Sequence, residues 1–232
     1  MKRIVCSLCT VACVALFSGC DLLDSGSGRG PAPAGAVDLG LSVKWATCNL
    51  GASSPEEYGD YYAWGETKPK TMYEWSNYKF NMGDGEYGPF SKYVTSGSYH
   101  PNDESYGKLD QKSKLEPADD AARAKLGKKW RIPTNEEWEE LWLFCDIEWT
   151  TINGENGIKV TGDTGKWIFL PTAGFHDEEG VFSTGAGFYW SSCIVDKTSP
   201  YLAREFYFNS AGVIPSEDDW RWLGLSIRPV YD

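Results

Sequence analysis

The strongest periodic pattern in the chain predicts a helix over residues 134–145. Thr134 and Glu137 have the spacing of a capping box, in which a hydroxyl and a carboxylate satisfy the first backbone N–H groups of a helix. Apolar side chains then recur at spacings of three and four residues, which places them on one helix face. They are Trp138, Leu141, Trp142 and Cys145. We expect this face to pack in the core, with a ligand-binding aromatic stripe as the less favoured interpretation.

A shorter helix is predicted over residues 117–126, because proline and aspartate come early and Gly127 follows its last residue. Elsewhere, β-rich runs separated by turn sequences predict short strands. These runs lie within 37–50, 58–64, 149–152, 158–161, 166–170, 188–191, 203–208, 212–214 and 226–230. Residues 68–114 are rich in Gly, Ser, Asn, Tyr and Lys without helical periodicity, which predicts a loop-rich insertion. Two helices among many short strands indicate an α+β domain.

The first 19 residues have the pattern of a bacterial lipoprotein signal peptide. Two basic residues precede an apolar stretch over 4–17 that is too short to span a bilayer permanently. Small residues then stand before Cys20, as they do before the lipid-accepting cysteine of a lipobox. We predict that residues 1–19 are removed and that Cys20 carries the lipid (palmitate). An ordinary secretory signal with an incidental cysteine is the alternative.

Residues 20–36 are rich in Gly, Ser, Pro and Ala, a composition that forms a flexible tether rather than a core. The folded domain would therefore span 37–232 and be held beside the membrane by the lipid alone. Loss of the two basic residues of the signal changes the net charge from −11 to −13, so anionic headgroups repel the domain. We predict an outer-membrane protein displayed on the cell surface, with a periplasm-facing orientation as the alternative.

Composition narrows the function further. An acidic chain lacks the basic face that phosphate contacts need, so we expect no nucleic-acid partner. Aromatic content is high, with 11 Trp, 13 Tyr and 10 Phe making up 15% of the chain. So many flat side chains exceed what a core of this size needs, and we expect some of them to be exposed.

Cysteine usage excludes one class of metal site. Once the signal is removed and Cys20 is lipidated, Cys48, Cys145 and Cys193 remain in an export compartment where disulfides form. Their number is odd, so at most one intramolecular pair forms and one thiol is left over. Only two histidines are present, and no Cys-x-x-Cys motif remains, so no structural zinc site is predicted.

Several segments resemble one bacterial domain family. The run Trp130–Trp138 resembles a motif of C-type-lectin-like domains. Further segments lie in order along the chain: VDLGL at 37–41, WATCN at 45–49, YYAWGE at 61–66, LPTAG at 170–174, YWSS at 189–192, FNS at 208–210 and SIRPV at 226–230. Through these segments the chain resembles more closely, over roughly 37–231, the Fibrobacter succinogenes major paralogous domain (FISUMP) family.

The resemblance implies a C-type-lectin-like fold, with two helices packed on small, mostly antiparallel sheets and with its termini close together. It also implies that Cys48, which lies in the WATCN segment, pairs with Cys145 and leaves Cys193 free. Variable proteins of diversity-generating retroelements share this fold and are mutated in a C-terminal stretch that ends near S-[VI]-R-P-V. The corresponding stretch here would be 189–230, with 217–223 as its most exposed part.

An enzymatic function is disfavoured. Formylglycine-generating enzymes share the fold, and that resemblance implies two nearby copper-binding cysteines near the C-terminus, where this chain has only Cys193. His176-Asp177 with a serine at 191–192 suggests a hydrolase triad, but sequence position gives no geometry. Adjacent acids at 178–179 and 218–219 suggest glycosidase carboxylates, although such pairs in polar loops are more often solvated surface. We predict no catalytic residue.

The best candidate binding site is a C-terminal face. Trp220 and Trp222 flank Arg221, and a strand would present both indoles on one side. Trp, Tyr and Arg beside carboxylates are the residue types that dominate recognition sites. The predicted ligand-binding residues are Tyr201, Arg204, Glu205, Glu217, Asp218, Asp219, Trp220 and Trp222. We predict no metal and no cofactor, with calcium on the carboxylates of 217–219 as the alternative.

We therefore expect a non-catalytic, lipid-anchored surface protein that binds an extracellular protein or glycan through this C-terminal face. A structural or adhesive subunit of a surface assembly, such as a pilus tip or a glycan-capture complex, is the alternative. An enzyme of the formylglycine-generating type is the least favoured function.

Overall fold

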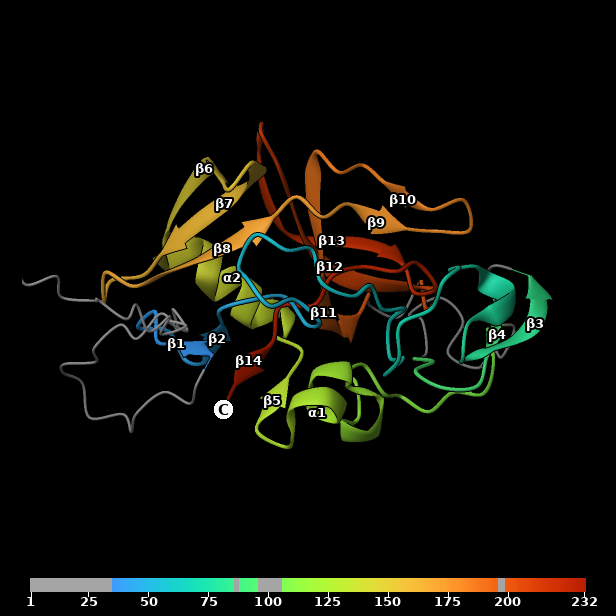
Figure 1. Ribbon diagram of the computed structural model, residues 1–232. Helices are drawn as coiled ribbons and strands as arrows, with labels where there is room; N and C mark the ends of the chain where they lie inside the picture. Colours follow the sequence, from blue (N-terminus) through green and yellow to red (C-terminus); the bar gives the residue numbers. More distant parts are fainter. Residues whose placement is uncertain (1–34, 86–87, 96–105, 196–198) are drawn as a thin grey trace, which may run out of the picture. The chain divides into compact units, whose positions relative to one another are not determined.

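Short strands and two α-helices make up the computed structural model, which describes residues 35–85, 88–95, 106–195 and 199–232 (Figure 1). The predicted signal peptide, Cys20 and the tether up to residue 34 lie outside the described residues. The α-helices are α1 (Ala121–Leu126) and α2 (Asn135–Phe144), and the 3-10 helices are η1 (Trp75–Asn77) and η2 (Pro117–Asp119).

Every pairing between the named strands is antiparallel. One sheet has the order β1 (Ala36–Val37), β2 (Lys44–Ala46), β14 (Val230–Tyr231), β5 (Trp130–Arg131). Two three-stranded sheets are formed by β6 (Asp146–Ile152), β7 (Glu155–Thr161), β8 (Trp167–Pro171) and by β11 (Ala186–Ile194), β12 (Leu202–Asn209), β13 (Gly212–Trp220). Two hairpins are formed by β3 (Asn81–Gly85) with β4 (Gly88–Phe90) and by β9 (Phe175–His176) with β10 (Val181–Phe182).

Helix α2 begins as its sequence predicts. The Thr134 hydroxyl accepts the Glu137 N–H at 3.3 Å, and the Glu137 carboxylate accepts the Thr134 N–H at 2.8 Å, which completes a capping box. The same carboxylate accepts two hydrogen bonds from Arg131, at 2.6 and 2.7 Å. The bidentate pair therefore ties the start of α2 to β5.

Only part of the predicted apolar face of α2 lies in the core. Trp138 and Leu141 are fully buried, and the Trp138 ring stacks on Phe206 of β12 at 4.5 Å. Trp142 is 43% exposed and Cys145 is half-buried, which corrects the prediction that all four residues are core. The reason is that Trp138 and Leu141 pack in the core cluster that includes Phe206 of β12, whereas Trp142 and Cys145 line an open groove at the tip of the β12–β13 hairpin.

Two other predictions require correction. The predicted helix over 117–126 is divided at Asp120, whose backbone is extended and whose carboxylate caps α1 by accepting the Arg123 N–H at 3.0 Å. The other carboxylate oxygen accepts the Ile132 N–H at 2.9 Å, so it links α1 to the segment before α2.

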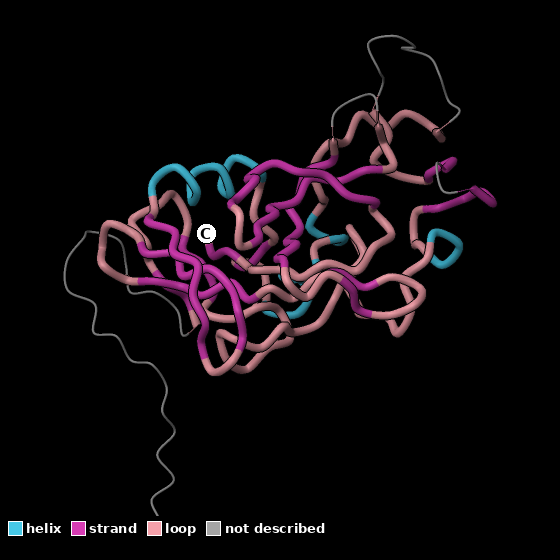
Figure 2. Tube along the Cα trace, turned by 90° about the horizontal axis from the view of Figure 1, so that it is seen from above, coloured by secondary structure: helices cyan, strands magenta, loops and turns pink. Residues whose placement is uncertain are grey.

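The predicted strand at 58–64 is reduced to a single bridge between Tyr62 and Leu225. Much of the described chain is loop and turn between short strands, as Figure 2 shows.

The described residues from Gly35 to Asp232 form one compact unit with two clusters of buried apolar side chains. One cluster, built around Trp45 and Trp138, lies where α2 packs between the β6–β7–β8 and β11–β12–β13 sheets (Figure 1). The other, built around Trp64 and Trp190, includes the aromatic residues of the 68–114 insertion. The insertion therefore contributes to the core, although it has few regular elements.

The insertion is joined to the C-terminal segment by a buried guanidinium. Arg221 is fully buried, and its central carbon lies 4.8–5.9 Å from the centroids of five aromatic rings. These rings belong to Trp64, Tyr78, Phe80, Phe90 and Tyr93. The guanidinium donates hydrogen bonds to the Tyr78 hydroxyl and to the carbonyls of Lys92, Tyr93 and Pro200. No carboxylate of the described residues forms an ion pair with it, so carbonyl dipoles and ring faces compensate for its lost hydration.

A second fully buried arginine, Arg228, links the C-terminal segment by hydrogen bonds to the end of β2, to the segment that follows it and to β8. Its guanidinium donates to the Asn49 amide oxygen at 3.0 Å and to the carbonyls of Ala46 at 3.0 Å and Phe169 at 2.6 Å. Burial lowers the pKa of Arg228 from its ordinary value. The C-terminal segment is therefore anchored on both of its arginines.

We predict that Arg221→Lys destabilises the fold by about 2–4 kcal/mol, because an ammonium group cannot reproduce the planar fork that serves four acceptors. Urea unfolding followed by tryptophan fluorescence measures the change. Arg204→Lys is the matched control, since Arg204 is partly exposed and its ion pair with Asp218 is long, at 3.4 Å; the expected loss is less than about 1 kcal/mol. Equal losses in the two variants would contradict the proposed stabilising role of the cage, that is, of the five aromatic rings and four hydrogen-bond acceptors around Arg221.

Candidate functional site

The β12–β13 pairing brings the predicted ligand-binding residues together at one end of the hairpin. Four pairs of residues lie opposite each other there: Leu202 with Trp220, Ala203 with Asp219, Arg204 with Asp218, and Glu205 with Glu217. Tyr201 directly precedes β12. The segment 217–220 is thus the end of a nine-residue strand, not an exposed loop beyond a strand limited to 212–214. Arg221 and Leu223 are buried, so the expectation that 217–223 is the most exposed part of the C-terminal stretch is wrong.

Strand alternation divides the predicted residues between the two sides of the sheet. Arg204, Asp218 and Trp220 share one side, because Arg204 faces Asp218 across the pair and Trp220 is two residues further along β13. The Tyr201 ring lies 5.3 Å from Trp220, and the Trp222 ring lies 6.4 Å from it. We call these five half-buried residues, Tyr201, Arg204, Asp218, Trp220 and Trp222, the aromatic face.

The other side of the sheet carries the remaining carboxyl groups. Glu205 faces Glu217, and Asp219 is two residues along β13 from Glu217. Glu205 is only 1% exposed, and its Oε2 has no hydrogen-bond partner among the described residues. Because Glu205 points into the protein, its predicted contact with a ligand is wrong.

Burial sets the protonation of these acids. Burial, followed by the negative charges of Asp219, Glu217 and Asp218, raises the pKa of Glu205 well above its ordinary value. Burial also raises the pKa of Asp219 to about 6, although its carboxylate accepts the Trp220 N–H at 2.8 Å. The buried side of β12–β13 therefore holds protons at pH values where exposed carboxyl groups are ionised.

A cleft of about 370 Å³ borders the aromatic face at Arg204. It lies between the first turn of α2, the end of β11 and the segment 111–114. That segment runs along β11, to which it is joined by a bridge between Lys114 and Cys193 and by a 3.0 Å hydrogen bond from the Ile194 N–H to the Ser113 carbonyl. The polar lining residues that sequence reasoning missed are Thr95, Gln111, Ser113, Lys114, Asn135 and Glu136. They come from three distant segments and share no motif, so no local pattern could have identified them.

The calcium alternative does not fit this geometry. Consecutive residues of a strand point to opposite sides, so Asp218 cannot join Glu217 and Asp219 around one ion. Asp218 instead pairs with Arg204. Within the described ranges, no three His, Cys, Asp or Glu side chains are grouped so that they could hold a metal ion.

The residues considered for a hydrolase triad have separate structural contacts. His176 Nδ1 lies 2.7 Å from the Asp177 carbonyl, and its ring packs against Tyr61 and Tyr73. The Ser191 hydroxyl accepts the Cys193 N–H at 3.1 Å. Among the described residues no hydrogen bond joins His176 to Ser191 or Ser192, so the triad alternative is not supported. Glu178 and Glu179 are exposed beside the β9–β10 turn, as expected for solvated acids.

The predicted disulfide is not present, because Cys48 and Cys145 are both free. The Cys48 thiol follows β2 and donates to the Thr47 hydroxyl at 3.5 Å. Cys145 follows α2, where burial and nearby carboxylates raise its pKa to about 11. The two thiols therefore belong to different local environments. Cys193 is also free, and it is buried.

Comparison of the chain with family profiles, with characterised proteins and with solved structures returned no significant match. In the part of the chain that the structure describes, no helix combines the length and apolar composition needed to cross a membrane.

The protonation of Glu205 predicts a pH-dependent stability. Its pKa is higher in the folded state than in the unfolded chain, so the folded state loses stability as pH rises above about 4.5. Asp219 acts in the same direction between about pH 4 and 6. Glu205→Gln is neutral at every pH and should raise the free energy of unfolding by about 1–3 kcal/mol at pH 8, with little change at pH 4.

Denaturant unfolding at several pH values between 4 and 8 measures this effect. Glu148→Gln, at an exposed position of β6, is the control and should change stability by less than about 0.5 kcal/mol throughout. A pH profile that is the same in Glu205→Gln and in the unchanged chain would contradict the assignment.

Proposed function

We propose that this chain is a non-catalytic ligand-binding domain of the C-type-lectin-like class, anchored by a lipid at Cys20 to the outer membrane and exposed at the cell surface. The arrangement of small antiparallel sheets around α2 supports the fold assignment. The first and last described strands, β1 and β14, both pair with β2, as expected for a domain whose ends lie together. The residues of the FISUMP-like segments act mainly as framework, since Trp45, Trp64 and Trp190 are fully buried.

The observation that carries the binding function is the aromatic face beside the polar cleft. Three aromatic rings follow one another at 5.3 and 6.4 Å, and the Arg204–Asp218 pair supplies a donor and an acceptor at the border of the cleft. Half-exposed Tyr and Trp combine a large contact area with a low loss of side-chain entropy on binding. Such a surface suits a glycan or a protein loop that places a flat or apolar group on the rings.

The fold holds this site in place before any ligand arrives. Arg221 lies between Trp220 and Trp222 in sequence and is enclosed by five rings. Its backbone N–H donates to the Tyr201 carbonyl at 3.1 Å, and its carbonyl accepts the Trp64 N–H at 2.9 Å. A site held in this way loses little conformational entropy on binding, which supports recognition. In the cleft, the buried hydroxyl of Thr95 and the amide oxygen of Asn135 have no partners among the described residues, so polar ligand atoms would stabilise them.

We expect a ligand found on an array of glycans and extracellular proteins to lose at least tenfold in affinity, about 1.4 kcal/mol, when Trp220→Ala is introduced. Arg204→Glu should weaken the same ligand, because it reverses the charge at the border of the cleft. Trp167→Ala is the control, since Trp167 is 38% exposed in β8, outside the aromatic face. Ligands whose affinity is unchanged by both Trp220→Ala and Arg204→Glu would exclude this face as the binding site.

The proposed anchor is tested in cells that express the full chain. Labelled palmitate should be incorporated into the protein, and Cys20→Ser should abolish the label and release the protein from the membrane fraction. Protease added to intact cells should digest the domain if it faces outward. Label retained in Cys20→Ser would contradict lipidation at this residue, and protection from protease would indicate the periplasm-facing orientation.

A further inference from the structure

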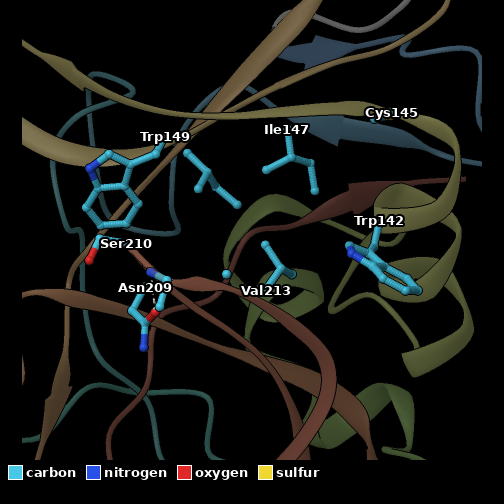
Figure 3. A pocket seen from close by; sticks show the side chains of 10 residues that line it. Trp142, Cys145, Ile147, Trp149, Asn209, Ser210 and Val213 are labelled. Atoms are coloured by element: carbon cyan, nitrogen blue, oxygen red, sulfur yellow. Dashed lines mark hydrogen bonds between the residues drawn. The ribbon is translucent and has the colours of Figure 1, made fainter.

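A second concave site lies at the opposite end of the β12–β13 hairpin from the aromatic face. This groove has a volume of about 310 Å³ and is enclosed by the end of α2, the inner side of β6 and β7, and the hairpin tip at 209–212 (Figure 3). The two sites are separated by most of the length of β13, which is about 25 Å at 3.3 Å per residue. The groove is therefore independent of the proposed function of the aromatic face.

Two exposed tryptophans define the groove. Trp142 is 43% exposed and Trp149 is 36% exposed, and in Figure 3 they lie at its two ends with Ile147 and Val213 between them. Among the described residues, neither indole packs against another aromatic ring, in contrast to Trp138, which is stacked on Phe206. Exposed indoles that line one groove offer apolar, flat contact surface to a ligand.

The polar groups of the groove lie at the hairpin tip. Asn209 is held by two hydrogen bonds, one from the Ala211 N–H to its side-chain oxygen at 2.8 Å and one from its amide group to the Tyr207 hydroxyl at 2.7 Å. Ser210 is exposed and lies near Trp149 in Figure 3, with its hydroxyl available to a ligand. The groove therefore combines flat apolar surface with hydroxyl and indole N–H groups.

Charge determines which ligands fit. No lining residue is charged, so the groove has no partner for an ionic group. Acidic residues stand nearby, since Asp163, Glu140 and Asp146 act electrostatically on the Cys145 thiol at one wall. An anionic ligand would be repelled, and a purely apolar ligand would leave the hydroxyl and N–H groups without partners.

We propose that this groove binds a neutral pyranose ring, with the C–H face of the sugar packed on the exposed indole of Trp149 and its hydroxyl groups hydrogen-bonded at the hairpin tip. A sugar ring fits because it has an apolar face and a polar edge. The site belongs to side chains of α2, β6 and the β12–β13 turn, none of which is part of the aromatic face.

The test uses the full chain in a detergent without sugar headgroups and a set of methyl pyranosides of glucose, galactose, mannose and N-acetylglucosamine. At least one of them should bind with a Kd on the order of 1 mM, as expected for a ligand of this size, measured by calorimetry and by tryptophan fluorescence. Glucuronate, which adds a negative charge, should bind at least tenfold more weakly. Cyclohexanol, which matches the ring size without the set of hydroxyl groups, should also bind at least tenfold more weakly.

Trp149→Ala should reduce the affinity for the neutral pyranoside at least tenfold, while leaving the thermal unfolding temperature nearly unchanged, because this side chain is partly exposed. Trp167→Ala is the matched control: Trp167 is 38% exposed, but the strand register places it on the opposite side of the same sheet, beside Lys159. The affinity of the Trp167→Ala variant for the neutral pyranoside should be unchanged. Absence of binding by all four pyranosides, equal binding of cyclohexanol or glucuronate, or an equal loss in Trp167→Ala would each overturn the proposal.

Discussion

The arrangement of the C-terminal segment depends on the guanidinium of Arg221, which is removed from water without a carboxylate partner among the described residues. Desolvation of such a cation is costly, and here it is compensated by three carbonyl oxygens, one tyrosine hydroxyl and the faces of five aromatic rings. All five rings belong to residues between 64 and 93. The loop-rich insertion and the C-terminal segment therefore depend on each other, because the rings of the insertion are buried around the guanidinium that the C-terminal segment supplies.

The β12–β13 hairpin connects the buried Arg221 to both candidate sites, the aromatic face and the groove. At one end, Arg221 follows the last strand residue and determines how Trp220 and Trp222 stand beside Tyr201. At the other end, the hairpin tip forms the groove with Trp142 of α2 and Trp149 of β6. Between them, strand alternation directs Arg204 and Asp218 to one side and the buried Glu205, whose pKa is raised by its burial, to the other. One hairpin thus separates a charged, aromatic surface from an uncharged groove.

The high aromatic content divides into three structural roles. Trp45, Trp64, Trp138 and Trp190 are fully buried and build the two core clusters. The rings around Arg221 replace an ion pair with a polarisable cage. Some of the remaining flat side chains form the aromatic face or line the groove, at opposite ends of one hairpin, whereas Phe144, Trp167 and Phe182 are exposed elsewhere.

Local patterns in the sequence determined the start of α2, because a capping box acts within four residues, and most strands of the two three-stranded sheets, because turn signals and β-rich runs are also local. The same reasoning located the residues around 201–222 but assigned Glu205 and Trp142 to the wrong environments. Whether a side chain on an amphipathic element is covered depends on where the neighbouring element ends, which is a long-range property. Only the tertiary structure decided that Arg221 is buried, that the cleft draws on three distant segments, and that Trp142 near the end of α2 is left exposed beside a hairpin tip. Each of these depends on contacts between residues far apart in the chain, for which local spacing carries no information.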